Sequence, residues 1–83
     1  MFKAETVYIL FDDGMIIGAF ESREAIDKFM QEEFNAEDIY YREYFDSDEE
    51  YEEVIKEANE AIAAKQYYKL DYYIGEYTMY KEV

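Results

Sequence analysis

Two short apolar runs separated by a turn signal predict a β-hairpin near the start of the chain. The runs are Thr6–Phe11 (TVYILF) and Met15–Phe20 (MIIGAF), and Asp13-Gly14 lies between them. An Asp-Gly pair suits a type I′ turn, which needs a positive φ at both central residues. In the predicted register the facing residues are Phe11 and Ile16, Leu10 and Ile17, and Tyr8 and Ala19. Both faces of the first run are apolar, so we expect it inside a sheet, with Gly18 at a bulge or a close approach.

Helical spacing of apolar residues follows the hairpin. Ser22 is a suitable N-cap for a helix from Arg23 to about Glu33. Its apolar face is formed by Ala25, Ile26, Phe29 and Met30. Glu33 falls on that face, so we expect the helix to end there. Asn35 is a candidate for the left-handed residue just past the end.

A second helix is predicted from Asp46-Ser47 to about Lys65. Ser47 with Glu50 three residues later forms a capping box. At 100° per residue, one apolar stripe contains Tyr51, Val54, Ile55, Ala58 and Ile62. Acidic residues cover the far side of this helix, and those in its first turn suit the positive end of the helix dipole.

The remaining segments read as strands. Ile39–Phe45 (IYYREYF) alternates in a way that predicts a third strand, with a continued helix as the competing interpretation. Residues 66–83 predict one or two further strands, with Gly75 as a bulge or break. The order β-β-α-β-α-β predicts an α+β fold with a small antiparallel or mixed sheet and two helices packed on one face. A chain of 83 residues is expected to form a single domain over residues 1–83.

Charge changes this picture. The chain has 22 acidic and 8 basic side chains, a net charge of −14. Residues 32–60 hold thirteen of the acids against two bases, a net charge of −11. We call these thirteen residues the acidic belt: Glu32, Glu33, Glu37, Asp38, Glu43, Asp46, Asp48, Glu49, Glu50, Glu52, Glu53, Glu57 and Glu60. Aromatic residues, which acidic disordered chains lack, make up 20% of the sequence and predict a folded chain.

The residue types present argue against catalysis. There is no His and no Cys, so the common nucleophile–base pairs are not available. The three glycines form no phosphate-binding loop. Asp46, Asp48, Glu50 and Glu57 imitate the frame of an EF-hand, but Tyr51 occupies the position that requires Gly. We therefore expect a protein that is not an enzyme, with no cofactor and no specific metal site.

Partner and compartment can be predicted from the same composition. The negative charge opposes direct binding to nucleic acid and to anionic membranes. The N-terminal residues do not resemble a signal peptide, and the absence of cysteines favours a reducing compartment, so a cytoplasmic location is expected. The sequence leaves homodimer formation open.

The acidic belt is a candidate partner-binding surface. A surface built for solubility intersperses both signs of charge, and this one does not. Carboxylates at i, i+4 on a helix lie about 6 Å apart, and such rows imitate the charge of a DNA backbone. The belt therefore predicts a basic DNA-binding protein as partner. Four tyrosines close to the belt in the sequence are candidates for further contacts: Tyr40, Tyr44, Tyr67 and Tyr68.

In size, acidity, lack of Cys and clustered carboxylates, the chain resembles the small phage-encoded DNA-mimic inhibitors. Members of that group occlude host proteins such as a nucleoid protein, uracil-DNA glycosylase, restriction enzymes or CRISPR effectors. The resemblance is one of type, centred on residues 32–60, and it implies a role in host takeover through protein–protein interaction. The alternative is a small intracellular binding module of the immunity or antitoxin type, which neutralises a basic partner enzyme.

Overall fold

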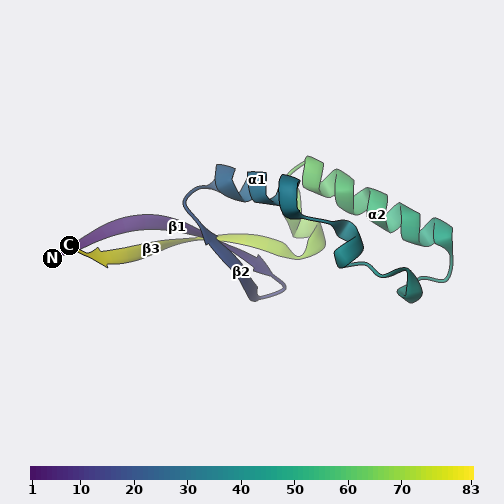
Figure 1. The fold of residues 1–83 in the computed structure, drawn as a ribbon, viewed down its shortest axis with the longest axis horizontal. Coiled ribbons are helices and arrows are strands. Elements are labelled where there is room, and N and C mark those ends of the chain that lie inside the picture. Colours follow the sequence, from purple (N-terminus) through teal and green to yellow (C-terminus); the bar gives the residue numbers. More distant parts are fainter.

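The computed structural model describes all 83 residues and shows an α+β fold. Its sheet is antiparallel and has the strand order β2-β1-β3. The strands are β1 (Phe2–Asp12), β2 (Met15–Phe20) and β3 (Tyr72–Glu82) (Figure 1). The central position of β1 confirms the prediction drawn from its two apolar faces.

The hairpin turn forms as predicted. Asp13 and Gly14 have φ angles of 46° and 85°, which is the left-handed pair that a type I′ turn requires. The register is right at the turn, where Phe11 pairs with Ile16, but it shifts beyond that point. Leu10 pairs with Gly18 rather than Ile17, because Ile17 is the extra residue of a β-bulge.

This bulge corrects the predicted pairing of Tyr8 with Ala19, since Tyr8 faces Phe20 and Ile9 faces Ala19. The observed register puts Tyr8, Leu10 and Phe20 on the same face of the sheet. That face carries the core.

Both predicted helices are present, and each begins at the predicted cap. In α1 (Arg23–Glu33) the Ser22 hydroxyl oxygen accepts a hydrogen bond of 3.0 Å from the Ala25 backbone N–H. In α2 (Asp48–Ala63) the Ser47 hydroxyl accepts from the Glu50 N–H at 3.2 Å. The helix ends two residues earlier than expected, because Lys65 adopts a left-handed conformation with a φ of 59°. The Gln66 N–H then donates to the Ala61 carbonyl, as in a Schellman ending.

The predicted third strand is wrong. Residues 36–45 form two short 3₁₀ turns, η1 (Ala36–Asp38) and η2 (Arg42–Tyr44). Several of their N–H groups donate to nearby carbonyls rather than to a strand, for example from Tyr44 to the Tyr41 carbonyl. The element order is therefore β-β-α-α-β. Asn35 is also not left-handed: it is extended, and its side chain caps η1.

The C-terminal segment forms a 3₁₀ turn, η3 (Tyr67–Leu70), followed by one uninterrupted strand. Pairing with β1 runs continuously past Gly75, so the predicted bulge or break is absent. Gly75 has a different role. A Cβ at this position would lie 2.4 Å from the ring of Tyr77 and 3.1 Å from that of Phe11. A larger residue here would force the aromatic rings that lie over this part of the strand to move.

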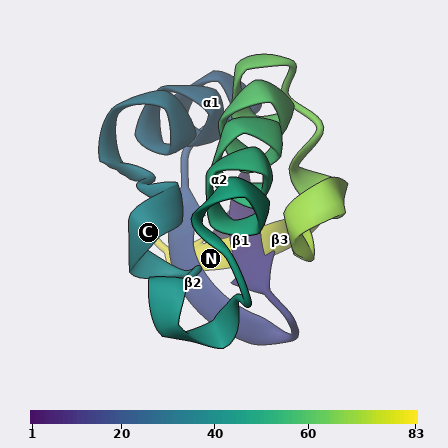
Figure 2. The same ribbon diagram turned by 90° about the vertical axis from the view of Figure 1, so that its right-hand side faces the viewer.

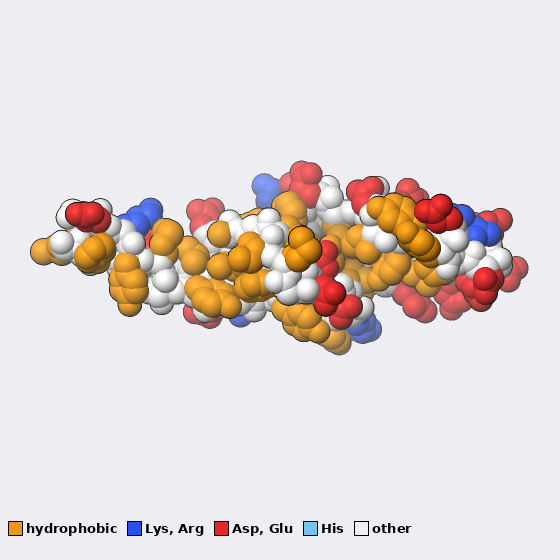
Figure 3. Space-filling model, turned by 90° about the horizontal axis from the view of Figure 1, so that it is seen from below, with side chains coloured by type: hydrophobic (Ala, Val, Ile, Leu, Met, Phe, Trp, Pro, Cys, Tyr) orange, Lys and Arg blue, Asp and Glu red, His pale blue; other side chains and the backbone are white.

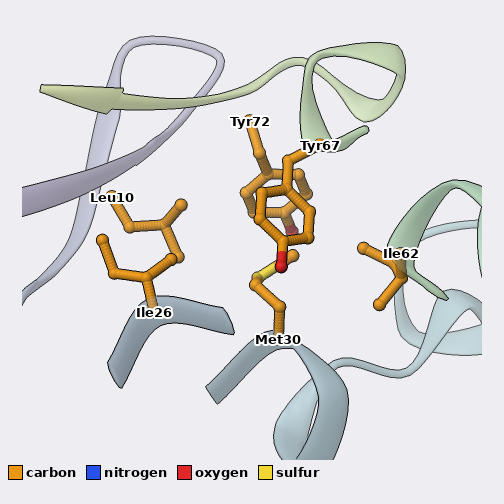
Figure 4. Packing of buried hydrophobic residues seen from close by; sticks show 6 residues of the cluster. All are labelled: Leu10, Ile26, Met30, Ile62, Tyr67 and Tyr72. Atoms are coloured by element: carbon orange, nitrogen blue, oxygen red, sulfur yellow. The ribbon is translucent and has the colours of Figure 1, made fainter. Parts of the chain in front are cut away.

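The core lies between α1, the end of α2, η3 and one face of the sheet. Figure 4 shows its six residues: Leu10, Ile26, Met30, Ile62, Tyr67 and Tyr72. From the predicted stripe of α2, Ala58 and Ile62 are buried. Ile55 is a correction, since it is half-buried beside a surface groove and does not belong to the core. No helix combines the length and the apolar character needed to cross a membrane.

The molecule is elongated, with extents of 59 × 21 × 17 Å. At one end β1 and β3 project together as a two-stranded ribbon, and both chain termini lie at its tip (Figure 1). Helix α1 lies over the middle of the molecule, and α2 extends from beside it to the other end (Figures 1 and 2). Helix α1 contacts β1 and β2, whereas α2 contacts α1, η1 and η3. Helix α2 and the turns before it therefore form one end of the molecule.

Candidate protein-binding surface

Helix α2 carries seven of the thirteen belt residues, and all seven are exposed. Its apolar side faces η1 and η3, so the helical phase turns the acids outward. Glu49, Glu53 and Glu57 follow one another at i, i+4 and rise about 6 Å per step along the axis. Glu60 lies on the same side one turn further on. The structure thus places a row of carboxylates opposite the buried stripe, as the sequence predicts.

The other belt residues surround α2 at the same end of the molecule. Glu32 and Glu33 lie in the last turn of α1, Glu37 and Asp38 in η1, and Glu43 in η2. Asp46 precedes α2 and completes the set. All are exposed. Figure 3 shows carboxylates crowded at the end that α2 and its preceding turns occupy, and apolar side chains along the ribbon.

Few of these carboxylates have a basic partner. Arg42 Nε contacts Asp48 Oδ1 at 2.5 Å, and its Nη1 donates to the Phe45 carbonyl at 2.7 Å. Lys56 Nζ lies 3.9 Å from Glu60 Oε1. These two pairs leave eleven of the thirteen acids without an ion pair within the chain. The local field is therefore strongly negative, and it is uncompensated by the fold itself.

Two acids of the belt occupy positions that are unfavourable for stability. Glu32 and Glu33 lie in the last turn of α1, which contains no basic residue. The C-terminal end of a helix dipole is negative, so each carboxylate there costs about 0.3–1 kcal/mol. Helix α2 likewise has no basic residue in its last turn. Such placements do not serve folding.

A shallow groove runs beside α2 within the belt. It has a volume of about 800 Å³, and its lining includes Glu37, Arg42, Tyr51, Ile55, Lys56 and Glu60. Its lining therefore combines the apolar side chains of Tyr51 and Ile55 with charged side chains of both signs. The sequence pattern does not reveal this groove, because Ile55 lies at the edge of the apolar stripe and its spacing predicts a core position.

The tyrosines divide into buried and exposed groups. Tyr44 is 74% exposed and packs edge-to-face against Tyr41, with ring centroids 5.8 Å apart. Tyr68 is also exposed, and Tyr40 is half-buried. Tyr67 is a correction to the predicted contact set, because it belongs to the core. An alternating strand pattern does not distinguish Tyr41 from its neighbours, so the sequence does not predict this contact.

The ionisable groups with altered proton affinity lie in the core, away from this surface. Burial, reinforced by a hydrogen bond to Asp27, raises the pKa of Tyr67 to about 12. Burial and the charge of Asp12 raise the pKa of Tyr72 to about 12. Both shifts keep these side chains neutral, which suits packing. The acids also form no cluster of three or more groups placed to hold a metal ion.

The arrangement can attract and hold a positively charged macromolecular surface. Its carboxylates are exposed, mostly unpaired and spread over one end of an elongated molecule, with apolar and aromatic side chains among them. Scans of protein-family models, curated proteins and solved structures find no match for this chain.

Proposed function

We propose that the acidic belt binds a basic DNA-binding protein and competes with DNA for it. The observation that carries the proposal is the set of eleven exposed carboxylates that no basic side chain of the fold compensates. A partner with a positively charged groove supplies the missing charge. Complementary potentials of this kind increase both the rate and the specificity of association.

The charge density of α2 is on the scale of a DNA surface. A helix of 16 residues is about 24 Å long. Duplex DNA carries about one charge per 1.7 Å, and so about 14 charges over that length on both strands. Two of the seven acids of α2 are paired with a base, which leaves five unpaired carboxylates, or about a third of this number. The acids of α1, η1 and η2 widen the charged surface.

The acidic belt lowers the stability of the fold, and this favours a functional role for it over a role in solubility alone. Glu32 and Glu33 oppose the dipole of α1, and the carboxylates of the belt repel one another. A helix that only needed solubility would mix lysines among its glutamates. In α2 the sole lysine is Lys56, and it is paired with Glu60.

The groove beside α2 supports a second candidate, a module that neutralises a basic enzyme in the manner of immunity proteins. Tyr51 and Ile55 line this groove and can contact an apolar side chain of a partner. The phosphate backbone of DNA has no such apolar groove. The two candidates differ in the target surface. A DNA mimic occupies a DNA-binding groove, whereas an immunity-type module covers an active site.

The proposal is tested by affinity capture from bacterial lysate with three baits. The first is the wild-type chain. The second reverses Glu49, Glu53, Glu57 and Glu60 to Lys, all of which lie off the buried stripe. The third is matched in charge and reverses four exposed acids outside the belt: Glu21, Glu24, Glu76 and Glu82.

We expect the first and third baits to retain the same basic proteins and the second to lose them. Equal loss with the second and third baits would mean that net charge alone attracts the partner. Retention by all three would place the binding surface elsewhere. Circular dichroism of each bait confirms that the helices remain folded.

A further inference from the structure

The ribbon of β1 and β3 lacks any covering element. Strand β2 pairs only with Tyr8–Asp12, so Phe2–Val7 pairs with β3 alone. In Figure 1 no helix lies over this part of the two strands. Phe2 and Tyr80 are 66% and 68% exposed. A two-stranded ribbon is marginally stable in water by itself, which makes the exposed length of this ribbon unusual for a solitary chain.

The outer edge of β1 in the ribbon has free hydrogen-bonding groups. The Asp13 N–H donates to the Asp71 carbonyl, and the Val83 N–H donates to the Met1 carbonyl, each at 2.9 Å. Antiparallel ladders alternate, so odd-numbered residues of β1 direct their N–H and C=O groups toward β3. Phe2, Ala4 and Thr6 therefore direct theirs outward. Further along the same edge, the even-numbered residues of β1 direct these groups to β2. Strand β2 does not extend beside the ribbon, so the outward groups there have no strand partner.

Charge sets the ribbon apart from the rest of the chain. Residues 1–7 and 77–83 contain two lysines and two glutamates, so their side chains have no net charge. The whole −14 therefore belongs to residues 8–76. A basic partner is drawn to the acidic belt at the other end of the molecule. A second copy of this chain is not repelled at the ribbon.

The charges within the ribbon are unevenly paired. Lys3 lies directly opposite Lys81 in the register of β1 with β3, which is unfavourable for two like charges on one face. Lys81 is compensated by Glu5, with Nζ and Oε2 3.1 Å apart. No ion pair within the chain compensates Lys3. Lys3 is thus a cation at an open strand edge that still lacks a partner.

We propose that two copies of this chain associate through the β1 edges of their ribbons, antiparallel, with Ala4 opposite Ala4 of the second copy. A twofold axis perpendicular to the sheet maps each edge onto the other and gives a closed, self-complementary contact. In this register Phe2, Ala4 and Thr6 of one copy form hydrogen-bonded pairs with Thr6, Ala4 and Phe2 of the other. The two sheets become continuous in the order β3-β1-β1-β3.

Electrostatics selects this register among those that the ladder permits. It puts Lys3 opposite Glu5 of the second copy, twice by symmetry, on the face where Lys3 has no partner. Shifting the centre by one residue toward the N-terminus puts Lys3 opposite Lys3, and shifting it the other way puts Glu5 opposite Glu5. Both shifted registers therefore place like charges directly opposite each other, which is destabilising.

The same register gives the exposed apolar side chains of the ribbon new neighbours. Phe2 comes to lie beside Thr6 of the second copy on the face that Tyr80 shares. Ala4 at the centre is small, so the two Tyr80 rings flank it. The acidic belts point away from each other at the two ends of the pair. Their repulsion is screened, because a Debye length at about 0.15 M salt is roughly 8 Å and each molecule is 59 Å long.

Sedimentation velocity of the full chain over a range of concentrations tests this pairing. The wild type is expected to sediment with twice the monomer mass of 10.1 kDa. Ala4→Pro removes an outward N–H without breaking the β1–β3 ladder, and it is expected to give monomers. Thr78→Pro is the matched control: by the same alternation its N–H points to the outer edge of β3, so this variant is expected to remain dimeric.

Reversing the charges of Lys3 and Glu5 tests the register itself. Lys3→Glu places two carboxylates opposite each other at two symmetric positions of the dimer. It is expected to raise the dimer dissociation constant on the order of tenfold. Adding Glu5→Lys restores opposite charges, and the double variant is expected to regain most of the lost affinity. A monomeric wild type overturns the proposal. Loss of the dimer in Thr78→Pro but not in Ala4→Pro overturns it as well, because the β3 edge would then be the contact.

Discussion

The hydroxyl group of Tyr67 donates a hydrogen bond of 2.6 Å to Asp27 Oδ1 and so connects η3 with α1 across 40 residues of sequence. Lys65 Nζ lies 3.4 Å from the other carboxylate oxygen of Asp27. Gln31 adds a further connection, since its side-chain amide donates to the Ile62 carbonyl at 2.6 Å. These contacts hold α2 against α1, and they determine where the acidic belt lies relative to the sheet.

Removing the Tyr67 hydroxyl should weaken this connection. We predict that Tyr67→Phe lowers the free energy of unfolding by about 1 kcal/mol or somewhat more, because a hydrogen bond to a charged group is lost while the ring still packs. Tyr68→Phe is the control, since Tyr68 is 58% exposed and makes no side-chain hydrogen bond. Urea unfolding monitored by circular dichroism measures both. Equal stabilities of the two variants would contradict the assigned role.

Stability should fall at high pH. Burial raises the pKa values of Tyr67 and Tyr72 from 10.0 to about 12, so the folded state holds these phenolic protons more tightly than the unfolded state. The stabilisation is complete below pH 10 and is lost as the pH rises from 10 toward 12. Melting temperatures measured from pH 8 to pH 12 should show this decline. In Tyr67→Phe the decline should be smaller, and an unchanged slope would contradict the coupling.

The core assignment distinguishes two isoleucines that the sequence treats alike. Ile26 is fully buried, whereas Ile55 lines the groove. We predict that Ile26→Ala costs about 2–5 kcal/mol, as for other buried isoleucines. Ile55→Ala should cost clearly less, because its side chain is partly in water already. Urea titrations of the two variants measure the difference, and an Ile55→Ala variant as unstable as Ile26→Ala would contradict the observed packing.

Local signals in the sequence predicted the elements that depend on neighbouring residues. Asp13-Gly14 determines the hairpin turn, and Ser22 and Ser47 determine where the helices begin, because each acts within three or four residues. The outward phase of the acids on α2 follows from the apolar stripe in the same way. These features carry most of the candidate site.

The errors concern residues whose environment depends on distant parts of the chain. The segment from Ile39 to Phe45 alternates like a strand, but its donors are satisfied in 3₁₀ turns and its rings pack on near neighbours. Tyr67 and Tyr68 are adjacent and identical in type, but only Tyr67 packs in the core cluster, where its hydroxyl also finds Asp27. Likewise, nothing local in the pattern shows that Ile17 is the extra residue of the bulge.

Salt should stabilise the fold. Eleven unpaired carboxylates at one end of the molecule repel one another, and about 0.15 M salt screens charges beyond roughly 8 Å. We therefore predict that the melting temperature rises from near-zero to moderate salt. The reversal of Glu49, Glu53, Glu57 and Glu60 to Lys should flatten this dependence. A falling trend in the wild type would mean that favourable ion pairs outweigh the repulsion.

The most direct test of the central claim is competition for DNA on the captured partner. Labelled DNA is bound to the partner, and this chain is titrated at two salt concentrations while fluorescence anisotropy is followed. The account predicts that the wild type and the variant reversed at Glu21, Glu24, Glu76 and Glu82 displace the DNA. The variant reversed at Glu49, Glu53, Glu57 and Glu60 should fail, and displacement should weaken steeply as salt increases. DNA that stays bound while the partner is saturated with the wild-type chain would contradict the account.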